Sequence, residues 1–396
     1  MKGMKETKFK NTEIGEIPKD WEVTPIGKAC NVRRGVRVTK EQLTDEGRYP
    51  VYQNTNYPMG YFDNYNVDAN TPFVIVGGSA GQIGLSKERY WAADDCAYFE
   101  KSNTLNKVFL YYELTHRQFE IKKFVRTASV PRLDRKVIES FVLPLPSLPE
   151  QHRIASALTS IDNLISSLGK LIEKKKNIKQ GAMQQLLTGK TRLKGFNEPW
   201  MEHTIDELFD LGNGYTPSKS NPAYWTNGTI PWFRMEDLRT NGRILKDSIQ
   251  HVTPEAVKGN GLYPKYSIIL STTATIGEHA LLIAESLANQ RFTFLNRKVN
   301  RRDMIDIIFF YYYCFILGKW CRANINAGGL LAVNMDDLKN HSIYIPKSIA
   351  EQQDIATILT KMDDEITALE AKKAKYEAIK QGMMQQLLTG KIRLIG

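Results

Sequence analysis

The sequence predicts an α+β protein in which two globular domains of mixed helix and strand are separated by two long antiparallel helices that form a coiled coil, with internal pseudo-two-fold symmetry. Three observations support this fold class. A long segment of the chain occurs twice, the apolar residues within it have coiled-coil spacing, and the text between the copies mixes short strand-like runs with glycine and proline turns. A duplicated chain is expected to fold as two related units.

The repeat is nearly identical in its two copies. EQHRIASALTSID and IKQGAMQQLLTGKTRL, starting at Glu150, return 201 positions later (351 − 150 = 201) as EQQDIATILTKMD and IKQGMMQQLLTGKIRL. The intervening segments are also related, because the Trp, Ile and Gly spacing that opens at Trp21 recurs at Trp200 (200 − 21 = 179), and Ile83-Gly84 aligns with Ile276-Gly277 (276 − 83 = 193). We therefore predict a globular domain over 1–148, a helical region over 149–194, a second globular domain over 195–348 and a C-terminal helical region over 349–396.

Apolar residues in each repeat are spaced alternately four and three positions apart. This spacing predicts a helix with one apolar face that packs against another helix in a coiled coil. The predicted helix–helix interface consists of Ile154, Leu158, Ile161, Ile165, Leu168, Ile172, Ile355, Leu359, Met362, Ile366, Leu369 and Tyr376. Both helices should end near LLTGK, where glycine can adopt the left-handed conformation, and Gly181 and Gly382 weaken the late turns enough to allow a kink. A helix from Glu150 to Thr188 spans roughly 58 Å at about 1.5 Å per residue. It could thus separate two domains along a duplex; the alternative is that each helix packs only on its own domain.

Composition favours a polyanionic partner. The 396 residues carry a formal net charge of +11, and clustered Lys and Arg attract phosphates, although a charged surface can also serve solubility alone. The four cysteines form no CxxC pair and the six histidines show no metal spacing, so we expect no metal, cofactor or disulfide. The N-terminus has no signal-peptide pattern, and the apolar run Met304–Gly318 is too short for a membrane span, which favours a buried helix and a cytoplasmic protein.

Loops rich in basic and small polar residues are the candidate DNA-binding elements. NVRRGVRVTK and KKFVRTASVPRLDRK are basic, and GGSAGQIG and STTATIG follow strand-like runs in the two halves. Arginine can bind phosphates or guanine edges, and small residues permit close backbone approach, although a plain tight turn explains the glycine-rich loops as well. The predicted DNA-binding residues are Arg33, Arg34, Gly35, Arg37, Lys40, Ser79, Gln82, Arg126, Ser129, Arg132, Tyr215, Lys219, Arg234, Thr272, Thr273, Thr275, Arg291 and Asn326.

Repeated EQ..IA helices that end in QQLLTGK, together with diverged domains that open on W....I.......G, resemble the specificity subunit of type I restriction-modification systems. The GNGYTPSKSNPAYWTNGTIPW run and the PSLPEQ segment are similar to that family too. The resemblance covers nearly the whole chain, and Ala350 departs from it where the first copy has Pro149. It implies two target-recognition domains that each read half of a bipartite double-stranded DNA site. It also implies helices that set the spacer and dock two methyltransferase (modification) subunits, with restriction/translocase subunits joining for cleavage.

Catalysis by the chain itself is the main alternative. NPAY at Asn221 is similar to the Asn-Pro-Pro-Tyr of amino-methyltransferases but lacks the second proline, and no glycine-rich S-adenosylmethionine segment accompanies it. LTGKT at Leu187 imitates the end of a Walker loop, but Gln184 stands where the first glycine belongs. We therefore expect no catalytic residues. A self-contained DNA methyltransferase or nuclease, and a coiled-coil scaffold for an acidic protein, remain as alternatives.

Overall fold

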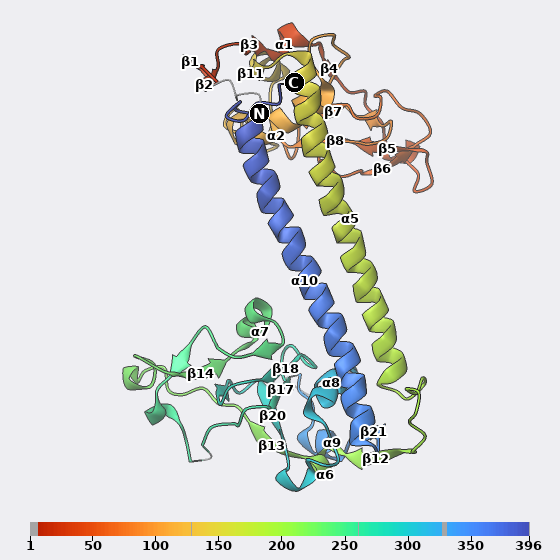
Figure 1. Ribbon diagram of the computed structural model, residues 1–396, viewed down its shortest axis with the longest axis vertical. Coiled ribbons are helices and arrows are strands. Elements are labelled where there is room, and N and C mark those ends of the chain that lie inside the picture. The colour runs from red at the N-terminus through yellow and green to blue at the C-terminus, as the bar shows by residue number, and fades with distance from the viewer. Residues whose placement is uncertain (1–6, 128, 260, 327–330, 396) are drawn as a thin grey trace, which may run out of the picture. The chain divides into compact units, whose positions relative to one another are not determined.

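The computed structural model describes residues 7–127, 129–259, 261–326 and 331–395. The chain divides into two compact units, unit 1 with residues 1–171 and 369–396, and unit 2 with residues 172–368. Both boundaries fall inside the long helices α5 (Leu148–Leu186) and α10 (Ile349–Leu387), which Figure 1 shows as continuous ribbons. Each unit therefore combines one mixed α/β domain with one part of each long helix, which confirms the predicted fold class.

Unit 1 contains small antiparallel and mixed sheets with short helices around them. A four-stranded sheet has the order β4-β10-β7-β8, a three-stranded sheet has the order β6-β5-β9, and β1-β2 and β11-β3 form two-stranded sheets. The elements are β1 (Phe9–Thr12), β2 (Gly15–Pro18), β3 (Glu22–Pro25), α1 (Ile26–Ala29), β4 (Val32–Arg34), η1 (Lys40–Gln42), β5 (Tyr49–Tyr52), β6 (Gly60–Phe62), β7 (Pro72–Ile75), β8 (Ile83–Leu85), β9 (Trp91–Ala92), β10 (Cys96–Phe99), α2 (Lys107–His116), α3 (Gln118–Lys122), α4 (Arg135–Ser140) and β11 (Val142–Leu145).

Unit 2 repeats this plan with insertions. Its sheets have the orders β13-β20-β17-β18-β15, β16-β14-β19 and β12-β21. The elements are β12 (Trp200–Thr204), α6 (Ile205–Leu208), β13 (Phe209–Asn213), η2 (Pro222–Tyr224), β14 (Ile230–Phe233), α7 (Met235–Asn241), β15 (Ile244–Leu245), β16 (His251–Val252), η3 (Pro254–Ala256), β17 (Ile268–Ser271), β18 (His279–Leu282), β19 (Leu287–Ala288), β20 (Phe292–Arg297), η4 (Val299–Arg301), α8 (Ile307–Ala323), α9 (Met335–Asn340) and β21 (Ser342–Pro346).

The two units share strand pairing as well as element order. In unit 1, β5 pairs antiparallel with β6 and parallel with β9, and in unit 2, β14 pairs antiparallel with β16 and parallel with β19. Two helices capped in the same way follow: the side chain of Asn106 accepts hydrogen bonds at the start of α2, and that of Asp306 does so at the start of α8. The predicted duplication is therefore visible in the fold of each half.

In each unit the two long helices run antiparallel. In unit 1, Asp162 of α5 pairs with Lys380 of α10, 2.7 Å apart. In unit 2, Lys175 of α5 pairs with Glu365 of α10, also at 2.7 Å, and Lys179 further along α5 pairs with Asp363 earlier on α10. Rising residue numbers on one helix thus meet falling numbers on the other.

Seam residues near the helix starts also belong to the domain cores. Ile154 and Leu158 are buried in the main unit 1 core, which also takes in Leu387 of α10, and Ile355 and Leu359 lie in the main unit 2 core. Further along the helices, Ile161, Leu168, Ile172 and Ile366 are buried, whereas Ile165, Met362, Leu369 and Tyr376 are half-buried. The first turns of each helix therefore pack on the helix's own domain, as the alternative predicted. The same side chains are also part of the predicted helix–helix seam.

The ends of the long helices follow the repeat. Gly189 and Gly390 have φ of +69° and +70°, the left-handed conformation predicted for them. Both helices pass through Gly181 and Gly382 without interruption. Each also begins two residues before its glutamate, so the replacement of Pro149 by Ala350 does not alter the start of the second helix.

An ion pair between a buried glutamate and a half-buried arginine ties the start of each long helix to the segment after the other. In unit 1, Arg393 donates to both carboxylate oxygens of Glu150, at 2.7 and 2.8 Å, and also bonds Asp20. In unit 2, Arg192 donates to both oxygens of Glu351, at 2.6 and 2.7 Å. Bidentate geometry of this kind gives the strongest hydrogen bonds between charged side chains. Each of these clamps joins the two copies of the repeat.

The adjacent glutamine explains the second letter of the EQ motif. Gln151 donates to the carbonyls of Thr104 and Pro146 and accepts from the backbone N–H of Asn106. Gln352 makes the same set of bonds with Met304, Pro346 and Asp306. Both glutamines are completely buried. Each one fixes the helix start against the loop that precedes α2 or α8.

Described residues 7–127, 129–259, 261–326 and 331–395 include no helix that is long and apolar enough to cross a membrane. The apolar run Met304–Gly318 falls mostly within α8, a helix with ten buried residues. The four cysteines are buried and free. Across those same ranges, no group of three or more His, Cys, Asp or Glu side chains could hold a metal ion.

We predict that Glu150→Ala lowers the free energy of unfolding by about 3 kcal/mol, because it leaves the largely buried Arg393 guanidinium with the exposed Asp20 as its carboxylate partner. Urea denaturation of the full chain measures this effect. The matched control is Glu173→Ala on the exposed face of α5, which should change stability by less than about 0.5 kcal/mol. Equal losses in the two variants would mean that the ion pair does not hold the helix.

Candidate nucleic-acid interface

Two loops are joined side by side in unit 1. The strand-turn loop (76–82) follows β7, and the post-helix loop (124–133) follows α3. The N–H of Gly78 donates to Pro131 at 3.1 Å, and that of Leu133 donates to Val76 at 2.9 Å. Reciprocal bonds between Arg126 and Arg132 close the post-helix loop on itself. Two loops that are far apart in sequence thus form one surface.

Unit 2 has the same arrangement. Its strand-turn loop (272–278) follows β17, and its post-helix loop (324–333) follows α8. The N–H of Val333 donates to Thr272 at 2.9 Å, Thr273 bridges Ala332, and the N–H of Asn326 donates to Ala332 at 3.0 Å. Residues 327–330 lie outside the described part of this loop. This paired-loop surface is present in both halves of the chain.

The structure corrects the alignment of the strand-turn loops. Gly81 corresponds to Gly277, because both have positive φ and donate from N–H to the residue that ends the preceding strand, Ile75 or Ser271. The offset is therefore 196 (277 − 81 = 196), and the predicted match of Ile83-Gly84 with Ile276-Gly277 is wrong. Glycine identity misled the alignment, because the conserved feature is the backbone conformation of the turn.

Arginines gather beside the unit 1 loops. Arg34 donates from Nε to the carbonyl of Asp94 at 2.8 Å, and Arg132 pairs with Asp95 at 2.9 Å. A shallow cavity of about 200 Å³ has two predicted residues in its lining, which consists of Arg34, Val76, Ala97, Arg132, Leu133 and Arg135. Arg126 is exposed in the same loop. The structure thus brings Arg34, Arg126 and Arg132 together around the paired loops.

Other predicted residues of unit 1 lie elsewhere or have a structural role. Arg33 and Arg34 are neighbours on β4, so their side chains point to opposite faces of the strand. Arg33 bonds Glu100 at 2.7 Å, and this contact lowers the pKa of the Glu100 carboxyl. A Cβ on Gly35 would lie 2.0 Å from the carbonyl oxygen of Ala93, so close backbone packing requires glycine there. Arg37 and Lys40 are exposed on either side of Val38, which packs with Val51 and Ala93.

Small polar residues of the unit 1 loops contact a third segment. The N–H of Ser79 donates to the carbonyl of Asn54 at 2.9 Å, and the side chain of Gln82 accepts from the N–H of Asn56 at 3.4 Å. Ser129 is exposed in the post-helix loop, next to position 128, which is outside the described residues. The segment 53–57 therefore borders the same surface, which the sequence did not predict.

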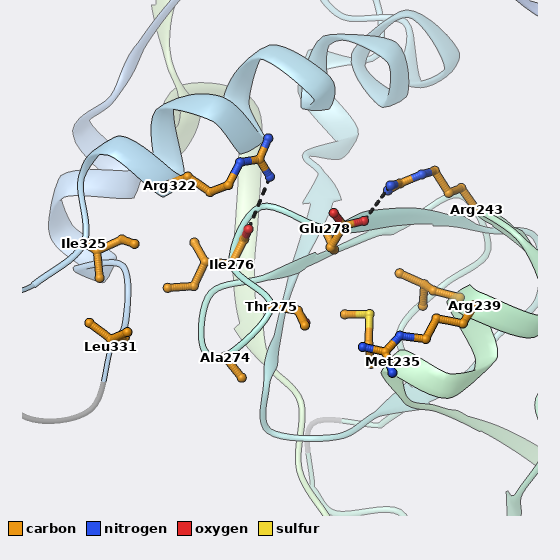
Figure 2. A pocket seen from close by; sticks show the side chains of 11 residues that line it. Met235, Arg239, Arg243, Ala274, Thr275, Ile276, Glu278, Arg322, Ile325 and Leu331 are labelled. Carbon is orange, nitrogen blue, oxygen red and sulfur yellow. Dashed lines mark hydrogen bonds and ion pairs between the residues drawn. The ribbon is translucent and has the colours of Figure 1, made fainter. Parts of the chain in front are cut away.

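The unit 2 loops border a cavity of about 750 Å³ (Figure 2). Figure 2 shows Arg243 bonded to Glu278 and Arg322 bonded to the carbonyl of Ile276, with Arg239 beside Met235. The complete lining consists of Met235, Leu238, Arg239, Arg243, Ala274, Thr275, Ile276, Glu278, Arg322, Ile325 and Leu331. Three arginines and one glutamate give this cavity a net positive charge. Beneath it, burial and the nearby Arg243 lower the pKa of His279 to about 3, so that imidazole is neutral.

Of these arginines, none was predicted. Arg322 matches Lys122 at the 200-residue offset of α8 from α2, so the internal repeat contained a usable signal. Arg239 and Arg243 belong to an insertion that has no counterpart in the first copy. Only the tertiary fold brings α7 and β15 to the edge of the strand-turn loop.

The predicted threonines of unit 2 differ in accessibility. Thr272 is buried and bonds Thr293 through its hydroxyl at 3.0 Å, and Thr275 lines the cavity with its hydroxyl 3.3 Å from that of Ser271. Thr273 is half-buried. Arg291, which accepts from Thr272 through its carbonyl, and Asn326 are both exposed beside the loops.

Tyr215, Lys219 and Arg234 are not part of this cavity. The hydroxyl of Tyr215 donates to the carbonyl of Ala256 at 3.1 Å and accepts from the N–H of Lys258, so it supports a neighbouring loop. Arg234 caps α7 and pairs with Glu236 at 3.0 Å, whereas Lys219 is exposed. Asn221, the candidate methyltransferase residue, accepts from the N–H of Ala223 as the cap of η2.

Fold and surface together define a protein with two related recognition domains on a shared helical support. A family model of the type I restriction modification DNA specificity domain matches residues 18–180 and again 197–381. The chain therefore belongs to the type I restriction-modification specificity family. It is a specificity subunit of such a system.

Similar proteins agree with this assignment. The specificity subunit of the type I restriction enzyme EcoprrI from Escherichia coli is 48% identical over 173 residues, which cover 42% of this chain and 43% of that protein. The MjaVIII specificity subunit from Methanocaldococcus jannaschii is 25% identical over 432 residues, 100% of this chain and 98% of that one. The crystal structure of the S subunit from M. genitalium has the same fold, with a TM-score of 0.67 at 19% identity, covering 93% of this chain and 96% of that one.

One loop residue has a strained backbone. Ala274, at the tip of the unit 2 strand-turn loop, has a φ of +62°, where the corresponding Gly78 has +81°. We predict that Ala274→Gly raises the free energy of unfolding by about 1 kcal/mol, because a Cβ disfavours the left-handed conformation. Denaturant unfolding measures it. Ala371→Gly on the exposed face of α10 should have the opposite sign and a similar size. A loss of stability in Ala274→Gly would show that this backbone stores no strain.

Proposed function

We propose that unit 1 and unit 2 each read one half of a bipartite, asymmetric double-stranded DNA site. The observation that carries this proposal is the paired-loop surface, which has the same backbone connections in both units but different side chains. Where unit 1 has Arg126 and Arg132, unit 2 has Asn326 and Ala332. The same loop backbone with different side chains suits two different half-sites, because a base is recognised by the hydrogen-bond donors and acceptors that contact its edge.

Within unit 1, we assign the base-reading role to Arg34 and Arg132 rather than to every basic residue nearby. Arg34 and Arg132 are oriented by Asp94 and Asp95, so their guanidinium groups are held in defined directions. A fixed, planar donor pair suits bidentate contact with a guanine edge or a phosphate. Arg37, Lys40 and Arg126 are exposed and suit contacts with the DNA backbone. In unit 2, Thr275 and Arg239, which line the cavity, and the exposed Asn326 would make the contacts with DNA.

We further propose that each copy of the repeat docks one methyltransferase subunit. The exposed helix face formed by Lys174, Ile178, Gly181 and Gln185 recurs as Lys375, Ile379, Gly382 and Gln386. A Cβ on Gly181 or Gly382 would meet nothing within 4 Å, so this chain's own packing does not require glycine there. Mid-helix glycine costs about 1 kcal/mol relative to alanine. The presence of this glycine in both copies suits a partner protein that approaches the helix closely and binds once to each copy.

The helices would then set the spacer between the half-sites, and the chain would contribute recognition without chemistry of its own, as part of a cytoplasmic complex that restriction/translocase subunits join for cleavage. Asn221 supports this view, since its side chain is used in a helix cap. No cofactor is needed for such a role. The alternative of a self-contained DNA methyltransferase or nuclease requires methyl transfer or cutting by the purified chain.

A domain exchange tests the proposal. We predict that replacing residues 195–348 with the equivalent domain of another specificity subunit changes one half-site and leaves the other as it was. Methylated sites in cells that carry the chain with its methyltransferase are mapped before and after the exchange. If both halves changed, the division between the units would be wrong. Methylation or cleavage by the purified chain alone would instead establish the catalytic alternative.

Neighbouring arginines on β4 provide a matched pair of variants. We predict that Arg34→Ala weakens binding to the cognate duplex by about 1–3 kcal/mol, because Arg34 lies beside the paired loops. Arg33→Ala should have little effect, since Arg33 is occupied by Glu100 away from the loops. Fluorescence anisotropy at a fixed salt concentration measures both. Equal losses would mean that β4 contributes general charge rather than a directed contact.

A further inference from the structure

A second basic cavity lies within unit 2, apart from the paired loops. It has a volume of about 650 Å³ and is bordered by the last turns of α5, by α8 and by the unit 2 part of α10. Five of its lining residues are cationic: Lys176, Lys179, Lys190, Lys319 and Arg322. We call this cavity the basic groove.

The groove keeps a positive charge after its internal pairing is counted. Asp363 is the one acidic residue in its lining, and it pairs with Lys179. Arg322 donates to the carbonyl of Ile276, a neutral acceptor that leaves its charge uncompensated. Lys190 and Lys319 are exposed at its edges. Cations that gather around a concave surface attract a polyanion more strongly than scattered surface charges do.

The groove adjoins the unit 2 candidate interface at one shared residue. Arg322 lines both the basic groove and the cavity beside the strand-turn loop. It stands near the end of α8, one turn after Lys319, and bonds the carbonyl of Ile276 in the strand-turn loop (Figure 2). A duplex read by the loops would therefore have a basic path leading away from its half-site.

Comparison of the two copies argues against the shared methyltransferase as the occupant. Glu377 stands at the position of Lys176, 201 residues apart, and Phe119 stands at the position of Lys319, 200 residues apart. Phe119 is 74% exposed. A partner that docks twice needs the same surface twice, as the stripe of Gly181 and Gly382 provides. Lys176 and Lys319 therefore have no cationic counterpart in unit 1, so the groove in this form belongs to unit 2.

We propose that the basic groove binds the phosphodiester backbone of the DNA that adjoins the half-site read by unit 2. This inference rests on the proposed function and adds a contact outside the recognition loops. Lys190, Lys319 and Arg322 would neutralise successive phosphates without reading bases, so the contact adds affinity and fixes the path of the duplex. The apolar floor, which includes Met183 and Phe315, would face the sugars.

The double variant Lys190→Gln/Lys319→Gln tests the proposal. Binding of the full chain, alone and with its methyltransferase subunits, is measured on the cognate duplex and on an unrelated duplex over a range of salt. Both affinities should fall by the same factor, with the recognised sequence unchanged. The slope of log K against log salt should become shallower by roughly 0.9 for each phosphate that the variant no longer neutralises, or about 1.8 in total.

Lys347→Gln/Lys361→Gln is the matched control, because these lysines are exposed in unit 2 outside the groove. It should leave the salt slope unchanged. A second readout uses duplexes with single neutral methylphosphonate linkages beside the half-site, which should weaken the wild type and not the groove variant. Equal slopes for the groove and control variants would overturn the proposal. Loss of methyltransferase binding with an unchanged DNA slope would also overturn it and identify a protein surface. A wild-type chain without sequence preference would contradict the proposed function itself.

Discussion

The ion pairs Glu150–Arg393 and Glu351–Arg192, in which each glutamate is buried, are the constraint on which the rest of the molecule depends. Each glutamate opens one long helix and each arginine follows the end of the other, so neither pair can form within a single copy of the repeat. A carboxylate with 1% exposure is stable in this position only with a charged partner in good geometry. Unit 1 is therefore completed by the C-terminal segment, and unit 2 by the segment after the first helix. Each half therefore depends on a segment that belongs to the other copy of the repeat.

A second duplicated contact sets the register of the helices in each unit. The hydroxyl of Tyr112 donates to Asp162, which pairs with Lys380 of the opposite helix, and Tyr312, Asp363 and Lys179 repeat the arrangement. A slip of one residue would leave an aspartate without its lysine in each unit. With domain, helix and opposite helix tied at these positions, the register of the helices does not depend on the recognition loops. They can differ between the units as different half-sites require.

The sequence predicted the helices well, because helix packing requires apolar residues at a regular spacing. It predicted the DNA-binding residues less well, because their role depends on the direction in which each side chain points. Ile154 to Ile172 could be recognised as a seam because helix geometry requires apolar residues at that spacing. Side-chain direction is set by the tertiary fold. Arg33 and Arg34 therefore looked equivalent in the sequence, although in the structure they bond different partners. Gly35 and Thr272 matched a binding pattern but serve packing and an internal hydrogen bond. Arg239 and Arg243 could not be predicted, because an insertion without a repeat partner brings them to the loops.

Positions at which the two halves differ are as informative about function as positions at which they are identical. Residues that are the same in both halves include the Glu–Arg clamps and one helix face, and we propose that a partner binds this face once in each half. Residues that differ include several around the paired loops and the basic groove, the surfaces that we propose contact different stretches of DNA. Phe119 in one copy and Lys319 in the other illustrate the point, because the same helix position is apolar in unit 1 and cationic in unit 2. A bipartite site is asymmetric, so a protein that reads it needs symmetry in its support and asymmetry on its DNA-facing surface.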